Sequence, residues 1–176
     1  MSFMFNLASQ RLYLPVAFYG PPSVANPLAL NLPDAAAVSR LKLDIYVKSS
    51  AFVATESTLA KIDSIAALQA VTGLDLHQGA GYGFKLITAV SVETVDPDTS
   101  DKVVFTPTPT SYSWLALGAA TAGFDLAALV VRYDNGAGID LPVYWYNGGG
   151  IVGTPMLGGD VNLSLPTIDA VRSLAA

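Results

Sequence analysis

Hydrophobic and polar residues alternate strictly along residues 40–48, which read RLKLDIYVK. Because consecutive side chains of a β-strand point to opposite faces, this alternation predicts a strand. One face carries the apolar residues Leu41, Leu43, Ile45 and Val47, and the other carries Lys42, Asp44, Tyr46 and Lys48. We therefore expect a half-buried strand whose apolar face lies on the core.

After Gly83 the chain consists of short runs that are rich in β-branched and aromatic residues, which is typical of strands. We expect strands in FKLITAVSVETV (84–95), VVFTP (103–107), SYSWLAL (111–117), FDLAALVVRY (124–133), LPVYWY (141–146) and VNLSL (161–165). Turn residues separate these runs at intervals of roughly ten residues, which favours a mainly β fold: an antiparallel β-sandwich or an open, jelly-roll-like barrel.

Only residues 57–70, STLAKIDSIAALQA, show helical periodicity. Leu59, Ile62 and Ile65 recur at the spacing of one helix face. Ser57 precedes them as a possible N-cap, and Gly73 follows as a stop. The sequence predicts one short helix.

The first 38 residues differ from the rest because they hold five of the eleven prolines, which disfavour helix. The segment is also too apolar for a disordered linker. We expect an extended N-terminal arm over residues 1–38 that packs against a partner surface, and a β-sandwich domain with a short C-terminal tail over residues 39–176. The candidate contact residues of the arm are Phe3, Phe5, Leu14, Phe18 and Tyr19.

The run LPVYWY combines an alternating pattern with three consecutive aromatic residues. Alternation assigns Trp145 to the core face and Tyr144 and Tyr146 to the outward face, where they are candidates for subunit contact or for stacking on a sugar. The alternative is that both faces are buried between layers. Pro142 cannot donate a ladder hydrogen bond, so it lies on an edge strand or at the start of the strand.

Composition and charge exclude several classes of function. Hydrophobic residues make up 52% of the chain and charged residues 13%, about half the usual share, so much of the surface is uncharged and suits permanent contact. The net charge of −5, with scattered Lys and Arg, argues against nucleic acid as a partner. The sequence has no run of 18 apolar residues, so we expect no membrane span, and the N-terminus lacks the pattern of a secretory signal.

Candidate chemistry is sparse. The chain has no cysteine, which excludes thiolate catalysis and disulfides, and its single histidine, His77, is expected to be a polar loop residue. The turn DPDTSD gathers Asp96, Asp98 and Asp101, a weak candidate for a metal site that lacks the glycine and glutamate of an EF-hand. Paired glutamates and a phosphate loop are missing. We expect neither a cofactor nor enzymatic activity.

The order of features over residues 40–165 resembles a family of small structural proteins of tailed bacteriophages. The matching features are LKLDIYVKSSAF, STLAKIDSI, GAGYGFKL, DKVVFTPTPTSYSWLAL with Trp114, ALVVRYDNG with Tyr133 and Asp134, and GGDVNLSLP with Gly158, Gly159 and Asp160. The resemblance implies a component of the virion, and it brings no catalytic residues. The chain departs from the family pattern in its first 38 residues and in the terminal TIDAVRSLAA.

Three hypotheses follow. The leading one is a non-enzymatic virion protein, a capsid decoration or cement protein, whose arm ties it to copies of itself in a closed oligomer such as a trimer, to the major capsid protein or to other virion proteins. Placement at the head–tail junction or in the tail is the alternative. The second is a carbohydrate- or receptor-binding β-sandwich that uses Tyr144 and Tyr146. The third, an enzyme, needs convergent polar groups that the sequence does not display.

Overall fold

The computed structural model describes residues 2–5, 40–87, 89–95, 102–108, 110–134, 140–148, 156–166 and 168–171. Within it, residues 2–4, 89–95, 102–107 and 168–171 are described by their backbone. The predicted fold class is confirmed, because the chain is mainly β with antiparallel sheets.

The largest sheet has the strand order β1-β9-β8-β2-β3, and β4 also pairs with β2. All of these pairings are antiparallel. The strands of this main sheet are β1 (Ser2–Met4), β2 (Leu41–Lys48), β3 (Leu74–Leu76), β4 (Lys85–Leu86), β8 (Asp125–Asp134) and β9 (Asp140–Tyr146).

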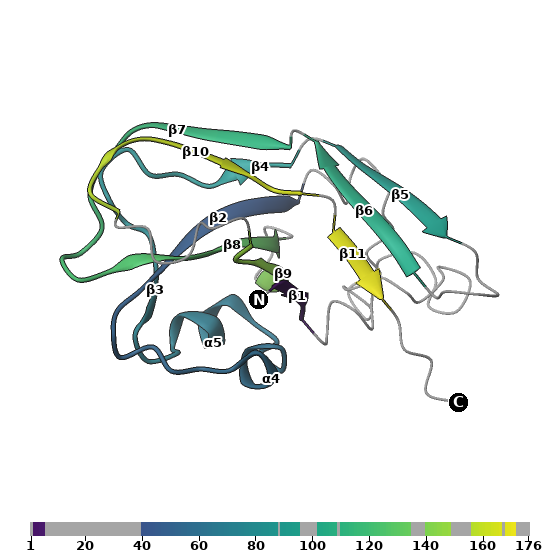
Figure 1. Cartoon of the computed structure of the whole chain (residues 1–176), viewed down its shortest axis with the longest axis horizontal. Coiled ribbons are helices and arrows are strands. Elements are labelled where there is room, and N and C mark those ends of the chain that lie inside the picture. The colour runs from purple at the N-terminus through teal and green to yellow at the C-terminus, as the bar shows by residue number, and fades with distance from the viewer. Residues whose placement is uncertain are drawn as a thin grey trace.

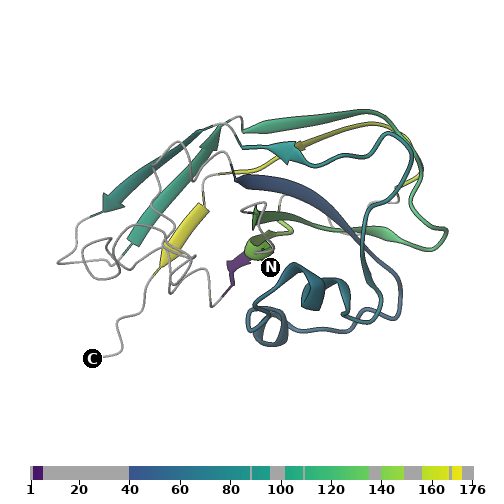
Figure 2. The same ribbon diagram turned by 180° about the vertical axis from the view of Figure 1, so that it is seen from behind.

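Two smaller sheets accompany the main sheet. One pairs β7 (Ser111–Leu117) with β10 (Gly159–Ser164), and the other has the order β11-β6-β5, from β5 (Ala89–Val95), β6 (Lys102–Thr108) and β11 (Ile168–Val171). Figure 1 shows β7 and β10 lying above the main sheet and the three-stranded sheet lying beside it; Figure 2 gives the same arrangement from behind. The described strands form a sandwich-like fold that does not close into a barrel.

Two short helices, α4 (Glu56–Leu59) and α5 (Ile65–Gln69), replace the single helix predicted over residues 57–70. The interruption is at Ser64, whose extended backbone cannot continue a helix and whose hydroxyl accepts a hydrogen bond from the Ala67 N–H at 3.2 Å. The predicted cap at Ser57 is also wrong, because the N-cap position of α4 is Thr55. Neither helix of the described residues is long and apolar enough to cross a membrane.

Both faces of the main sheet are buried, so the prediction of a half-buried strand at residues 40–48 is wrong. Asp44 and Tyr46 of β2 are 2% and 0% exposed although they lie opposite the apolar face. The helices explain this, because α4 and α5 lie below the main sheet while β7 and β10 lie above it (Figure 1). The Tyr46 ring packs against Trp145, with ring centroids 6.4 Å apart, and Phe52 stacks on Trp145.

The strand predicted over residues 84–95 is two strands in two different sheets. β4 pairs with β2, whereas β5 pairs with β6. Between them the Ile87 N–H donates to the Leu41 carbonyl and the Ile87 side chain is fully buried, which holds the chain on the main sheet up to that residue. The sequence patterns also did not predict β1, β3 and β11, which have three or four residues each.

Candidate functional site

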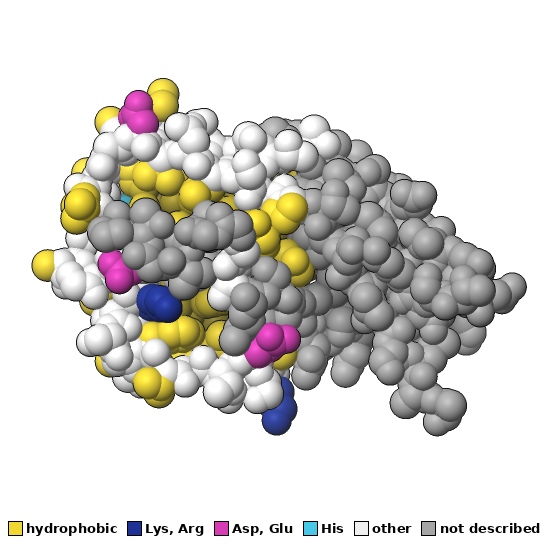
Figure 3. All heavy atoms as spheres, in the orientation of Figure 1, with side chains coloured by type: hydrophobic (Ala, Val, Ile, Leu, Met, Phe, Trp, Pro, Cys, Tyr) yellow, Lys and Arg dark blue, Asp and Glu magenta, His cyan; other side chains and the backbone are white. Residues whose placement is uncertain are grey.

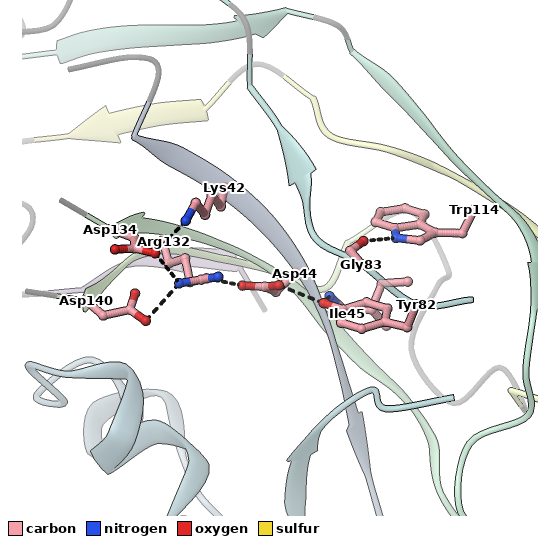
Figure 4. A network of polar contacts seen from close by, with 9 residues as sticks. All are labelled: Lys42, Asp44, Ile45, Tyr82, Gly83, Trp114, Arg132, Asp134 and Asp140. Carbon is pink, nitrogen blue, oxygen red and sulfur yellow. Dashed lines mark hydrogen bonds and ion pairs between the residues drawn. The ribbon is translucent and has the colours of Figure 1, made fainter. Parts of the chain in front are cut away.

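A cluster of charged side chains lies on the face of the main sheet that carries the helices (Figure 4). The register of β2 and β8 puts Lys42 opposite Arg132, and the register of β8 and β9 puts Asp134 opposite Asp140. Directly opposite residues of antiparallel strands project from the same face. Asp44 follows Lys42 on that face, so three strands together bring these five residues into one charged cluster.

Arg132 is the centre of the charged cluster. Its Nε donates to Asp44, and its Nη1 donates to Asp140 at 2.8 Å and to Asp134 at 3.3 Å. Lys42 forms an ion pair with Asp134. Burial lowers the pKa of Arg132, but the carboxylates of Asp44 and Asp140 outweigh it and raise the pKa above its ordinary value. The guanidinium therefore stays charged and holds three strands together.

Aromatic residues enclose one side of the charged cluster. The Tyr82 hydroxyl donates to Asp44 Oδ1 at 2.7 Å and accepts from the Ile45 N–H at 3.2 Å. Burial, and then the charge of Asp44, raise the pKa of Tyr82. The Phe84 ring lies 4.5 Å from Lys42 Nζ and 5.5 Å from the Arg132 guanidinium. The Tyr82 and Phe84 rings cover one side of the charged cluster, while Asp134 and Asp140 keep partial contact with solvent.

A cavity of about 320 Å³ opens between the charged cluster and α5. Its lining residues are Asp44, Ser64, Ile65, Ala66, Gln69, Leu76, Arg132 and Asp140. Burial raises the pKa of Asp140 against the opposing effect of Arg132, and its Oδ1 accepts no hydrogen bond from the described residues. The cavity can hold a small polar group, but the carboxylates around it already share a guanidinium. In the described part of the chain no group of three His, Asp or Glu is placed to hold a metal ion.

His77 lies in the loop after β3, as predicted, and its side chain is fully buried. Its ring packs edge-on against Tyr82 at 5.4 Å, and its backbone N–H donates to the Ile45 carbonyl at 2.9 Å. Burial lowers the pKa of His77, and the nearby backbone of Gly118 opposes part of this shift. A neutral, enclosed imidazole of this kind belongs to the core.

The structure describes four of the predicted contact residues: Phe3, Phe5, Tyr144 and Tyr146. Phe5 is fully buried and Tyr144 is 7% exposed, so the expectation that Tyr144 faces outward is wrong; Tyr146 is half-buried. The physical reason is that the second face of β9 is covered too. Phe3 stands opposite Trp145 in the ladder of β1 and β9. The other calls lie outside the described residues: Leu14, Phe18, Tyr19, Asp96, Asp98 and Asp101.

Pro142 is correctly placed near the start of β9, but β9 is not an edge strand. β1 pairs with it from Val143 to Tyr146, and Pro142 lies just before that stretch. On the other side the register shifts between Val131 and Arg132, which leaves Val143 as an extra residue in β9. Pro142, which has no backbone N–H to donate, therefore lies where the hydrogen-bond ladders of β9 with β1 and β8 are interrupted.

The charged cluster is the feature that the sequence patterns missed. Its only signal was one acidic residue in RLKLDIYVK and one arginine in VVRYD, each flanked by apolar residues. Comparison with known proteins adds no assignment: no protein-family model, no curated protein and no solved structure matches the chain.

Proposed function

We propose that the chain is a non-enzymatic structural protein of a tailed-bacteriophage virion, a capsid decoration or cement protein that acts through contacts with copies of itself and with the major capsid protein. The resemblance of residues 40–165 to small structural proteins of tailed bacteriophages supports the assignment to a virion. The physical support comes from how the described residues distribute charge.

The observation that carries the proposal is the outer layer of β7 and β10, in which Asp160 is the one charged residue. β7, SYSWLAL, has no charged residue, and Asp160, the charged residue of β10, accepts a hydrogen bond from the Ala116 N–H at 2.8 Å. Outward side chains of the two strands bond to each other: Ser111 with Ser164, and Ser113 with Asn162. Such a layer offers few groups that need bulk water.

Exposed leucines accompany this layer. Leu115 of β7 is 70% exposed, and Leu157, which precedes β10, is 83% exposed. In contrast, Lys42 and Arg132 of the main sheet form ion pairs with the three carboxylates of the charged cluster. Figure 3 shows few charged side chains over the described part of the face that it draws. A surface with exposed leucine and little charge favours a covered, permanent interface over free diffusion.

Light scattering of the purified protein tests the proposal. We expect a closed oligomer, such as a trimer, at micromolar concentration. The Leu115→Ser variant should weaken the binding of the protein to particles of its phage, while Ser113→Ala, on the same strand, should not. A strictly monomeric protein that fails to bind particles would overturn the proposal.

A further inference from the structure

The outermost strand of the main sheet comes from the N-terminus of the chain. β1 pairs with β9 in an antiparallel ladder that sets Ser2 opposite Tyr146 and Met4 opposite Tyr144. The ladder continues beyond the strand, because the Phe5 N–H donates to the Val143 carbonyl at 3.1 Å. Backbone hydrogen bonds of this kind depend on the edge that is offered and not on which chain offers the strand.

Phe5 gives this short strand an anchor. Its side chain is fully buried, is one of the largest fully buried side chains of the described residues and belongs to the hydrophobic core. A strand that adds a backbone ladder and one deeply buried aromatic anchor has the two features of strand addition between proteins: affinity from the ladder and specificity from the anchor.

The connection between β1 and the rest of the sheet is long. Residues 6–39 separate Phe5 from Arg40, and they include five prolines. A chain of this length spans up to about 110 Å when fully extended, so its length allows β1 to reach the sheet of another copy. Returning to its own sheet closes a loop whose entropic cost grows with length, whereas a neighbour at high local concentration offers the same contacts.

We propose that in the assembled oligomer β1 of one copy pairs with β9 of the next copy. The inference rests on the proposed function, since it requires a self-associating protein. Without β1, β9 would expose an unpaired row of backbone groups, and the incoming strand and Phe5 of the neighbour cover that row. A head-to-tail exchange of this kind closes into a ring when the rotation between copies allows it, which fits a trimer.

Introduced cysteines test the exchange directly, because the native chain has none. Phe5 and Val143 form a hydrogen-bonded pair, and such pairs alternate with closer, non-hydrogen-bonded pairs along an antiparallel ladder. Ser2 and Tyr146 are therefore a non-hydrogen-bonded pair, whose spacing suits a disulfide. Two full-length single variants, Ser2→Cys and Tyr146→Cys, one of them tagged, are mixed, assembled and oxidised.

Exchange predicts that the mixture gives a disulfide-linked dimer of one tagged and one untagged chain, and that the Ser2→Cys/Tyr146→Cys double variant gives covalent oligomers on a non-reducing gel. The proposal is overturned if the mixture gives no such dimer and the double variant links within single chains. An oligomer that persists in that case would leave the proposed function standing. A protein that is monomeric at all concentrations and also fails to bind particles would overturn both proposals.

Phe5→Ala provides a second test if Tyr146→Cys does not fold. Exchange predicts that Phe5→Ala raises the concentration at which the oligomer dissociates by at least tenfold, as measured by light scattering, since the anchor lies in the interface. The control Val53→Ala truncates a side chain that is 83% exposed and should leave dissociation unchanged. Equal dissociation of Phe5→Ala and the native protein would contradict the exchange.

Discussion

Replacing Arg132 with methionine tests whether the charged cluster holds the main sheet together. The change keeps an unbranched apolar stem but removes the hydrogen bonds to Asp44 and Asp140 and the ion pair with Asp134. The Asp44 side chain is 3% exposed, and among the described residues it keeps a hydrogen bond from the Tyr82 hydroxyl. The Asp140 side chain is 37% exposed and is solvated in part by water.

The expected loss of stability follows from this difference in burial between Asp44 and Asp140. Removing one partner of a buried ion pair costs about 3–5 kcal/mol, because it leaves an uncompensated charge. Since only one of the three carboxylates is deeply buried, we expect Arg132→Met to lower the free energy of unfolding by about 3 kcal/mol. Lys42→Met is the matched control: its pair with Asp134 has side chains 18% and 22% exposed, and such pairs contribute at most about 1 kcal/mol.

Urea unfolding followed by the fluorescence of the two tryptophans measures both variants. A third variant, Arg132→Met/Asp44→Leu, removes both charges and should recover part of the loss, because no unpaired buried charge remains. A loss below 1 kcal/mol for Arg132→Met would show that Arg132 does not hold the sheet together. A double variant that loses as much as the two single variants combined would show that Arg132 and Asp44 are not coupled.

Three further changes have defined outcomes. Burial lowers the pKa of His77 in the folded state below its ordinary value of 6.5. The neutral imidazole therefore contributes its full stability to the fold above pH 6.5, and that contribution is lost as the pH falls below 6.5. We expect the urea midpoint of His77→Gln to change less between pH 7 and pH 5 than that of the native protein. Gly73 has φ +75°, and an added Cβ would lie 2.4 Å from the Phe52 nitrogen. Gly73→Ala should therefore lower the melting temperature and reduce the free energy of unfolding by about 1–3 kcal/mol. The control Gly83→Ala, at a position with open space around it, should be near neutral. Trp114→Phe removes the 2.7 Å hydrogen bond to the Gly83 carbonyl and should cost about 1–2 kcal/mol in urea unfolding; an unchanged midpoint would contradict that bond.

Local patterns were enough to predict the fold class but not the neighbours of each strand. Alternation identified residues 40–48 and 141–146 as strands, because side-chain direction has a period of two. It could not show which faces are covered. Phe52 stacks on Trp145, Trp145 packs against Tyr46, and α5 contacts β9, so the face with polar and aromatic residues is buried as well.

The charged cluster was beyond sequence reasoning for a related reason. Asp44 and Arg132 are 88 residues apart, and only the register of β2 with β8 brings them together. A shift of one residue would move Arg132 to the opposite face. The same holds for β1, whose three residues carry no strand signal and which is defined by the edge of β9 that it covers.

A density map of the purified phage particle shows directly whether the protein is a covered virion component. We expect this chain to lie on the particle in closed rings, with the β7–β10 layer against a neighbouring protein and the side chains of Leu115 and Leu157 covered. A particle that lacks the chain, or one in which the β7–β10 layer is open to solvent in every copy, would contradict this expectation.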